Sequence, residues 1–345
     1  MKLVYHGDMG LGHHARQRAE AFARLPGVEV HRSAIPRLRG FLRLNAASLL
    51  RRLGMSVDFG GENAALLAMV RNVQPDIVFV DNARGIRPKT LTEIASLGAK
   101  LVFSSPDDIV APHNSSKWLV RSLPLWDLFF TTKTFNVEEL RERGVHRPIL
   151  VGNMYNPAIH RPLTSAEVGA DFEAFDIVFV GTHEKEREDD LRALARTGMR
   201  VLVHGNTASR LSKGWRVLED DGVTVRPAVI DDDYARAMHH GKIAMCFLRK
   251  MNRDQITQRS IEIPAMARPM LAEKTAEHDA HFVDGTEYAG FSTRDEMLAQ
   301  ATALLAEDGR RRELADAGRR RAQTSPYSID DVVAVMHGHI AALLG

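Results

Sequence analysis

The chain has 345 residues, of which 44% are hydrophobic and 26% are charged, and its formal net charge is +2. This length suits two ordinary domains, and this composition is typical of a globular protein with ample apolar material for a core. So small a net charge gives no support to a nucleic-acid-binding function. The single cysteine, Cys246, excludes an internal disulfide and a cysteine-rich zinc site.

The N-terminal sequence MKLVYHGDMG lacks the apolar segment of a signal peptide, and no apolar run approaches the roughly 18 residues of a spanning helix. We therefore expect a cytoplasmic protein. Residues 32–53 are basic, with interleaved leucines and no acidic residue. Such a segment either lies on an anionic surface, such as the inner face of a membrane, or packs its leucines as a surface helix. The second interpretation is favoured, because helices of this kind are common in soluble folds.

Strand-like and helix-like stretches alternate along the first half of the chain. The wholly apolar run DIVFV indicates a strand that is buried on both faces of a parallel sheet. Strands are predicted at residues 1–7, 76–81, 100–104, 126–131 and 148–151, and helices at 15–25, 90–97 and 136–143. This βα repeat predicts an α/β domain over residues 1–152.

Asparagines, prolines and a glycine interrupt residues 153–173, which we interpret as an interdomain linker. The βα repeat then restarts. Strands are predicted at 176–181, 200–205, 223–227 and 243–248, and helices at 189–196, 231–239 and over most of 293–345. The sequence thus predicts two doubly wound, Rossmann-like domains, the second over 174–325. Residues 326–345 would form a C-terminal helix that packs back on the first domain. Ligands of such folds bind at the carboxyl ends of strands, so we expect the site in a cleft between the domains.

Gly10, Gly12 and His13 follow the first strand and open a helix. Glycines let the backbone approach a ligand, and a helix N-terminus attracts anions. The full GxGxxG spacing is missing, which disfavours NAD binding. His13 either lines the site or is simply exposed to solvent.

Asp107 and Asp108 follow another strand, and His113 comes shortly after them. At this place a carboxylate would bind acceptor hydroxyls or help to move a proton, so we treat all three as candidate catalytic residues. The alternative is a turn or a helix cap, for which Ser-Pro-Asp is also well suited.

Two glycine-terminated strands open the second domain. Gly181 and Thr182 end the first, and Arg187 follows within the next helix. A glycine turn followed by a cation fits a diphosphate. His204, Gly205 and Asn206 end the next strand. Since parallel strands end at the same edge of a sheet, these groups are expected to converge.

Residues 248–270 combine cations, amides and carboxylates before turning apolar. Asp254 and Glu262 lie eight residues apart, so one helix would bring both near one face. Such a set suits a ligand with both phosphates and sugar hydroxyls, although a solvated charged helix face is equally possible on spacing alone. The candidate binding residues are Arg249, Asn252, Arg253, Gln255, Arg259, Ser260 and Glu262, with Asp254 as a candidate catalytic residue.

No HExxH or DxD-type motif stands at a strand end, so neither a metal nor another cofactor is expected. Asp231, Asp232 and Asp233 come closest, but they open a helix and are explained by capping and the helix dipole.

The second half resembles the C-terminal domain of retaining GT-B glycosyltransferases, in particular the CgeB-like branch of the group 1 enzymes. The matching stretches are VFVGTHEKER, VLVHG, NRDQITQRSIEIPAMARPMLAE and HFVDGTEYAGFSTRDEML. The stretches PDIVFVDN and LVFSSPDD are more loosely similar to the acceptor-side domain of such enzymes.

The resemblance implies that a nucleotide-diphosphate sugar is the co-substrate and binds mainly to the second domain. Glu262 falls at the position that holds ribose hydroxyls, and Arg187 at the position that neutralises the diphosphate, with Arg253 or Arg259 as a second cation. Asp254 stands where the family usually has a glutamate that contacts the transferred sugar. Retention at the anomeric carbon is implied by the resemblance alone.

We therefore expect a glycosyltransferase that acts on a glycan, lipid-linked or protein acceptor in bacterial surface polysaccharide or glycoconjugate assembly. A nucleotide-sugar epimerase of the same shape is the alternative, with Asp107, His113 and His204 as acid/base groups. A non-catalytic nucleotide-sugar-binding protein is a third possibility, which the aspartate at 254 keeps open.

Overall fold

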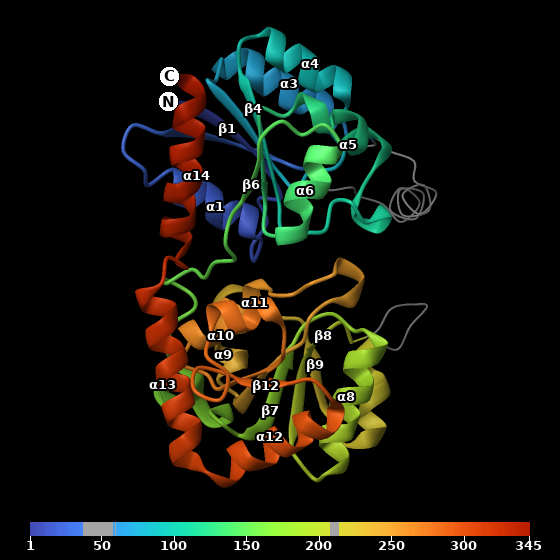
Figure 1. Cartoon of the computed structure of the whole chain (residues 1–345), viewed down its shortest axis with the longest axis vertical. Helices are drawn as coiled ribbons and strands as arrows, with labels where there is room; N and C mark the ends of the chain where they lie inside the picture. The colour runs from blue at the N-terminus through green and yellow to red at the C-terminus, as the bar shows by residue number, and fades with distance from the viewer. Residues whose placement is uncertain (37–57, 59, 208–213) are drawn as a thin grey trace. The chain divides into compact units, whose positions relative to one another are not determined.

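The computed structural model describes residues 1–36, 58, 60–207 and 214–345. The chain divides into two compact units. Unit 1 comprises Met1–Gly152 and Ile329–Gly345, and unit 2 comprises Asn153–Ser328 (Figure 1). Most of the basic segment 32–53 lies outside the described residues.

Unit 1 is built on a six-stranded parallel sheet in the order β2-β1-β3-β4-β5-β6. Its strands are β1 (Lys2–Gly7), β2 (Glu29–Ala34), β3 (Ile77–Asp81), β4 (Lys100–Ser105), β5 (Leu128–Thr131) and β6 (Pro148–Leu150). Every residue of β3 is buried, because helices cover both faces of the sheet.

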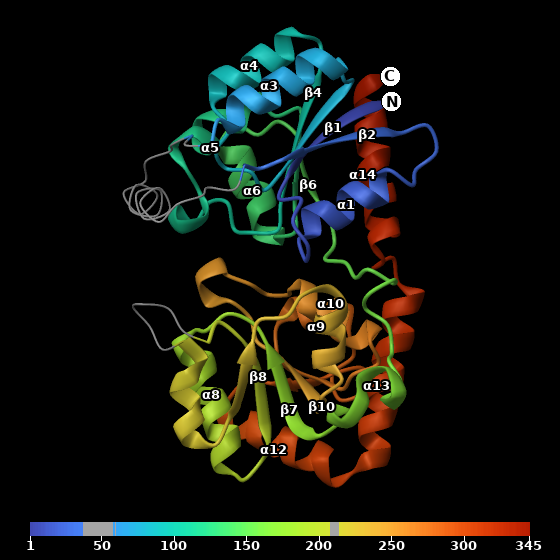
Figure 2. The ribbon, with the colours of Figure 1, turned by 180° about the vertical axis from the view of Figure 1, so that it is seen from behind.

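One face of this sheet packs against α3 (Glu62–Val73), α4 (Pro88–Ser96), α5 (Lys117–Ser122) and α6 (Thr134–Glu142). The other face packs against α1 (His14–Phe22), where the rings of Tyr5 and Phe79 stack and that of Phe22 packs against both at a tilt. Helix α14 (Ile329–Leu344) lies beside α1, and Arg24 forms an ion pair with Asp330 at its start (Figure 2). Short 3₁₀ turns occur at η1 (Pro112–Asn114) and η2 (Leu123–Leu125).

Unit 2 contains a second six-stranded parallel sheet in the order β12-β11-β10-β7-β8-β9. Its strands are β7 (Phe175–Val180), β8 (Val201–Gly205), β9 (Thr224–Pro227), β10 (Gly241–Cys246), β11 (Met270–Glu273) and β12 (Ala289–Phe291). The chain winds outward from β7 in one direction and from β10 in the other. The strand order therefore reverses between β7 and β10, which is where doubly wound folds bind ligands.

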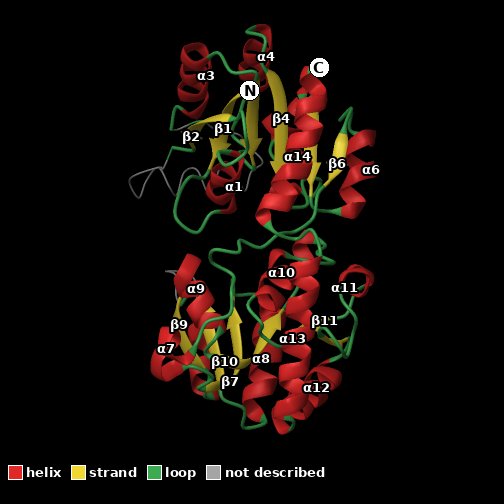
Figure 3. Cartoon of the chain, turned by 90° about the vertical axis from the view of Figure 1, so that its left-hand side faces the viewer, coloured by secondary structure: helices red, strands yellow, loops and turns green. Residues whose placement is uncertain are grey.

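Helices cover both faces of this sheet (Figure 3). On one face lie α8 (Lys185–Arg196), η4 (Gly214–Asp221) and α12 (Arg294–Ala306). On the other lie α9 (Asp231–Met238), α10 (Gln258–Ala265) and α11 (Ala276–His281). Helix α13 (Asp308–Thr324) packs on α10 and buries Leu314, Ala315 and Ala322, whereas most of its arginines are on the outer side.

Residues 153–173, interpreted from the sequence as a linker, belong to unit 2. They contain α7 (Ser165–Val168) and η3 (Gly169–Asp171), and Tyr155 pairs with Ser328 in an isolated parallel bridge. The prediction of two doubly wound α/β units is confirmed by the two sheets. Among the described residues, no helix combines the length and apolar character that crossing a membrane requires.

The prediction that one helix carries both Asp254 and Glu262 is wrong. Helix α10 begins only at Gln258, because Thr257 and Ser260 form a capping box at its N-terminus. The preceding residues form η5 (Lys250–Asn252) and a loop in which Arg253 has a φ of 48°. Asp254 therefore belongs to a loop rather than to the face of α10 that bears Glu262.

Candidate functional site

The glycine turns after β7 and β8 adjoin each other in unit 2. The backbone N–H of Gly181 donates to the carbonyl of His204 at 2.9 Å, and the indole N–H of Trp215 donates to the carbonyl of Gly181 at 2.9 Å. A Cβ at Gly205 would lie 2.2 Å from that same carbonyl oxygen. Close packing therefore already requires a glycine at 205.

His204 and Asn206 flank this glycine. His204 is buried and its Nδ1 donates to the carbonyl of Pro227 at 2.9 Å, while burial lowers the pKa of His204. Asn206 is exposed, and its carbonyl accepts from the backbone of Trp215 at 3.0 Å. Asn206 is thus accessible to a ligand, whereas His204 has a structural contact at the edge strand.

Arg187 extends from the first turn of α8 into the interior at the end of β7. Its side chain is only 9% exposed. Nη1 donates to the carbonyl and the hydroxyl of Thr182 at 3.2 and 3.4 Å, and the guanidinium lies 5.7 Å from the ring centre of Phe179. These contacts fix the guanidinium beside the glycine turn.

The Arg187 cation is incompletely satisfied. Its Nε is buried and makes no hydrogen bond to the described residues, and the nearest carboxylate oxygen, Oε2 of Glu184, is 3.7 Å away. Burial lowers the pKa of Arg187, and the charges of Arg259 and Arg249 lower it further. A buried donor without an acceptor is costly, so this arrangement favours an added anion.

Two more arginines complete a cationic cluster, which we define as Arg187, Arg249 and Arg259. Arg259 lies in the first turn of α10, with its guanidinium 5.9 Å from the ring centre of Tyr234. Its Nε is also buried without a hydrogen bond to the described residues. Arg249 follows β10 and donates from Nε to Glu184 at 2.8 Å. The cluster therefore stands at the ends of β7 and β10, where the strand order reverses.

Glu262 lies on α10 and is 5% exposed. The hydroxyl of Tyr234 donates to its Oε2 at 3.0 Å. Nδ1 of His160 accepts from the backbone N–H of Asn156 at 3.0 Å, so Nε2 carries the hydrogen and lies 3.7 Å from Oε1. Burial lowers the pKa of His160, which favours this neutral form. The carboxylate is thus held in place on both sides.

Sequence reasoning missed Tyr234 and His160. Tyr234 comes from α9 and His160 from the stretch interpreted as a linker, so only the tertiary fold brings them to Glu262. No spacing rule in the sequence connects the three residues.

The loop before α10 accounts for several other candidates. Asp254 accepts from Nδ2 of Asn252 at 2.7 Å and from the backbone N–H of Arg249 at 3.3 Å. Asn252 itself is buried. Arg253 and Gln255 are exposed on the same loop. Asp254 therefore shapes the loop, and Arg253 and Gln255 are the members that face solvent.

Ser260 cannot contact a ligand directly, because it is 0% exposed. Its Oγ lies 2.7 Å from Nε2 of His278 and 3.5 Å from Sγ of Cys246, and it accepts from the backbone N–H of Thr257 at 3.1 Å. The residue anchors the N-terminus of α10, which carries Arg259 and Glu262. Cys246 is a fully buried thiol, as its place in an apolar strand indicated.

In unit 1, Gly10, Gly12 and His13 form the loop between β1 and α1. Gly12 has a φ of 75°, which favours glycine. The side chain of His13 is half exposed, and its Nε2 lies 3.4 Å from Oδ2 of Asp8. Asp8 also accepts from the backbone of Gly10 at 2.9 Å. This loop is accessible at the carboxyl edge of the unit 1 sheet.

The three candidate catalytic residues after β4 differ in accessibility. Asp107 is partly exposed, forms an ion pair with Arg84 and accepts from Asn82 at 3.1 Å. Asp108 is 0% exposed and accepts from the backbone N–H groups of Val110 and Ala111, so it has the contacts of a turn-stabilising residue. His113 is exposed in η1. Burial thus removes Asp108 from the residues that can meet a substrate.

Among the described residues, no three or more His, Cys, Asp or Glu side chains are grouped so that they could hold a metal ion. The arginine cluster and the carboxylate of Glu262 both belong to the carboxyl edge of the unit 2 sheet, and together they suit an oxyanion and neighbouring hydroxyls.

Residues 185–337 match the protein family described as glycosyl transferase-like. The match covers somewhat less than half of the chain. It confirms the predicted resemblance to glycosyltransferases and the prediction of an enzyme of that type, but it does not distinguish the CgeB-like branch. No curated protein matches the sequence.

The fold of the whole chain is shared with solved structures. Sucrose-phosphate synthase from Thermosynechococcus elongatus is 13% identical in sequence and has a TM-score of 0.70. The match covers 100% of this chain and 99% of the synthase chain. Anabaena HepE in complex with UDP-glucose is 12% identical with a TM-score of 0.69, covering 99% and 100%. UDP-GlcNAc 2-epimerase from Neisseria meningitidis, bound to UDP-GlcNAc, is 11% identical with a TM-score of 0.59, covering 99% and 100%. These likenesses confirm the predicted GT-B fold.

Proposed function

We propose that the protein is a glycosyltransferase whose unit 2 binds a nucleotide-diphosphate sugar. The observation that carries this proposal is the arginine cluster, in which the Nε atoms of Arg187 and Arg259 are buried without hydrogen-bond partners among the described residues. A diphosphate supplies the negative charge and the acceptor oxygens that such a cluster needs. Glu262 is proposed to hold the ribose hydroxyls. The UDP-glucose bound by HepE supports a ligand of this kind.

The same groups suit the transfer step. The bond from the anomeric carbon to the phosphate oxygen breaks, and its electron pair stays on the departing nucleoside diphosphate. The acceptor hydroxyl oxygen takes its place and gives up its proton to solvent. Guanidinium groups fixed around the diphosphate stabilise the charge that develops on it, which is the largest contribution expected in such a reaction.

An epimerase is the second candidate, because UDP-GlcNAc 2-epimerase shares the fold. His204 is buried and its Nδ1 donates to the carbonyl of Pro227, but its Nε2 has no hydrogen-bond partner among the described residues, so His204 stays a candidate acid or base for this reaction. We favour transfer because the arginine cluster suits a departing diphosphate.

The finer features rest on the resemblance seen in the sequence. We propose transfer with retention, without a metal or other cofactor, onto a glycan, lipid-linked or protein acceptor of bacterial surface polysaccharide assembly. Asp107 and His13 of unit 1 are proposed to bind acceptor hydroxyls, since both are accessible at the carboxyl edge of its sheet.

Calorimetric titration with UDP, GDP, ADP and dTDP tests the donor site. We expect at least one to bind, and Glu262→Ala to weaken that binding about tenfold, the cost of losing a hydrogen bond to a charged group. Glu313→Ala, at an exposed position on α13, is the matched control and should bind as the unaltered protein does. Absence of binding by all four nucleotides contradicts the proposal.

The reaction is tested by incubating the matching nucleotide-glucose with a panel of glycan and lipid-linked acceptors, with and without EDTA. Acceptor-dependent release of nucleoside diphosphate that survives EDTA is the expected result. An epimerised sugar without release would instead establish the second candidate.

A further inference from the structure

A cavity of about 380 Å³ lies within unit 2 at the carboxyl ends of β7, β10, β11 and β12. The side chain of Arg187, whose Nε has no hydrogen-bond partner among the described residues, forms part of its wall. Since Arg187 is the proposed diphosphate-binding residue, the cavity is directly next to the place where the sugar is joined to the diphosphate. Its size is within the range of pockets that hold small ligands.

Most of the charged groups around the cavity already have partners. Asp190 binds Arg294 at 2.7 Å, and Lys274 binds Asp284 at 2.8 Å. Glu184, which lines the cavity, forms an ion pair at 2.8 Å with Arg249, which does not line it. These pairs make the wall polar but leave few groups available to a ligand.

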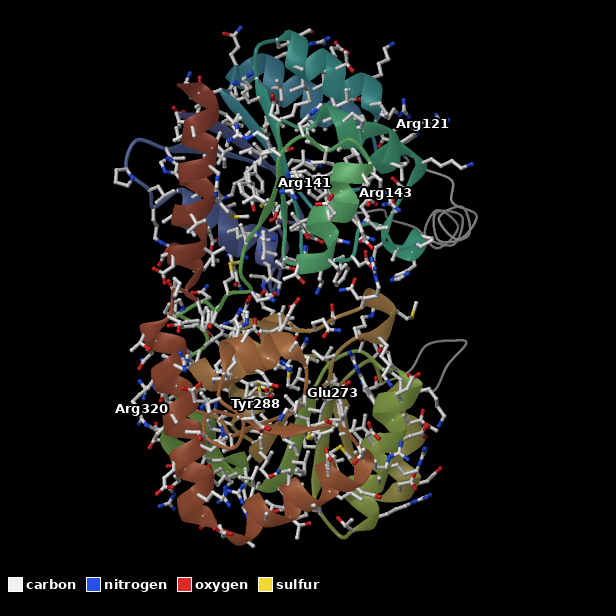
Figure 4. All side chains as sticks on the ribbon, viewed as in Figure 1. Arg121, Arg141, Arg143, Glu273, Tyr288 and Arg320 are labelled. Carbon is white, nitrogen blue, oxygen red and sulfur yellow. The ribbon has the colours of Figure 1, made fainter. Side chains whose placement is uncertain are left out.

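Glu186, Lys250 and Glu273 line the cavity and form no ion pair with the described residues, and of these three only Glu273 is not exposed. It ends β11, and its Oε1 accepts from the backbone N–H of Leu248 at 2.9 Å. Among the described residues no hydrogen bond reaches its Oε2. Burial raises the pKa of Glu273, which is the sign of a carboxyl group removed from bulk water. Glu273 is labelled in Figure 4.

The chemistry of Glu273 defines the group that fits beside the diphosphate. Arg187 is proposed to hold the diphosphate, whereas the carboxylate of Glu273 can only accept a hydrogen bond. A sugar hydroxyl can donate that bond, whereas a second carboxylate would meet the charge of Glu273. Five carboxylates and four cations line the cavity, and the diphosphate already occupies the cation of Arg187, so the wall does not favour a further negative charge.

We propose that this cavity receives the transferred sugar of the donor, and that Glu273 accepts a hydrogen bond from a hydroxyl of a neutral sugar and discriminates against a uronic acid. This assignment rests on the proposed donor site, because it places the sugar next to the diphosphate at Arg187. It adds a specificity-determining residue that the sequence alone did not indicate.

The test compares the binding of three compounds that share the best-bound nucleotide. They are the nucleoside diphosphate, its glucose ester and its glucuronic acid ester. Glu273→Gln keeps the size of the side chain and an oxygen for the Leu248 N–H, but removes the charge. We expect the affinity for the glucose ester to fall about tenfold, with the affinity for the nucleoside diphosphate unchanged. The affinity for the glucuronate ester should rise, which reverses or abolishes the preference for the neutral sugar.

Glu273→Asp is the second variant, because it keeps the charge but withdraws the carboxylate. It should weaken the binding of the glucose ester, while the protein should still bind the glucose ester more tightly than the glucuronate ester. Glu313→Gln on the exposed side of α13 is the matched control, and circular dichroism confirms that each variant is folded.

The two proposals fail in different ways. If Glu273→Gln weakens all three ligands equally, or none, the sugar assignment is overturned while the donor site at Arg187 and Glu262 stands. If no nucleoside diphosphate binds the unaltered protein, the proposed function fails and this assignment fails with it.

Discussion

The hydroxyl of Tyr234 on α9 donates a 3.0 Å hydrogen bond to Oε2 of Glu262 on α10. Both residues are buried, and the burial together with the nearby carboxylate raises the pKa of Tyr234 well above its usual value. The tyrosine therefore stays protonated and keeps the carboxylate in one orientation. If Glu262 holds a ribose, Tyr234 is the residue that positions it.

Tyr234→Phe should weaken nucleoside diphosphate binding about tenfold, because the charged carboxylate of Glu262 loses the hydrogen bond that orients it. The ring that packs in the core is retained. Isothermal titration calorimetry measures the change. The matched control is Tyr288→Phe, whose lost hydroxyl donates to Asp279 at 2.6 Å and not to Glu262 (Figure 4). Equal affinity of Tyr234→Phe and the unaltered protein would show that Glu262 is not a ligand contact.

Arg187→Met should separate stability from binding. Burial and the charges of two neighbouring arginines disfavour the charged form of the guanidinium. Its removal should therefore leave the melting temperature of the ligand-free protein unchanged or higher. The affinity for the nucleoside diphosphate should fall by at least about tenfold. Thermal unfolding and calorimetry on the same samples give both quantities.

Arg268→Met supplies the contrast, since Arg268 is equally buried but donates to Glu173 at 2.9 Å and to the carbonyl of Gly241 at 2.6 Å. Its loss should cost about 3 kcal/mol of stability and leave nucleotide affinity intact. A large destabilisation by Arg187→Met would mean that this arginine is chiefly structural.

His239 should make the stability of unit 2 fall in acid. It is 1% exposed; its Nδ1 donates to the carbonyl of Ala235 at 2.7 Å and its Nε2 accepts from the backbone N–H of Leu163 at 3.0 Å. Burial lowers the pKa of His239 to about 4, against 6.5 for an exposed histidine. Below pH 6.5 the unfolded chain therefore takes up a proton that the folded chain refuses.

The stabilisation is thus complete above pH 6.5 and is lost as the pH falls toward 4, by about 3 kcal/mol in all. Urea unfolding at several pH values measures the loss. His239→Gln should flatten this part of the profile, whereas His281→Gln, at a partly exposed position in the same unit, should not. An unchanged profile in His239→Gln would assign the acid sensitivity to other groups.

The interior strands of both sheets, except β11, could be predicted because they are apolar on both faces, as DIVFV shows twice in the sequence. The strand β2, with the sequence EVHRSA, was missed because it is an edge strand with one polar face. The start of α10 was placed too early, although Thr257 and Ser260 carry the capping signal in the sequence.

The charged residues of the candidate site, such as Arg187, Arg259 and Glu262, were predicted from their types and from their places after strands, and they stay predictions. Their supporting residues were not predicted, because Tyr234 and His160 reach Glu262 only through the packing of separate elements. Glu273 is the last residue of β11, a short strand that the sequence pattern did not predict, so nothing marked its carboxylate as a group at the sheet edge.

Unit 1 is assembled from two stretches of chain separated by the whole of unit 2. During synthesis, the ribosome delivers every residue of unit 2 before it delivers α14, whose Val333, Met336 and Ile340 are buried in unit 1. Unit 1 therefore cannot complete its fold before unit 2 has been synthesised, in contrast to the usual order in which an N-terminal domain folds first. Until α14 emerges, the apolar surface that it covers in unit 1 stays open, and we expect the nascent chain to be most prone to aggregation in that interval.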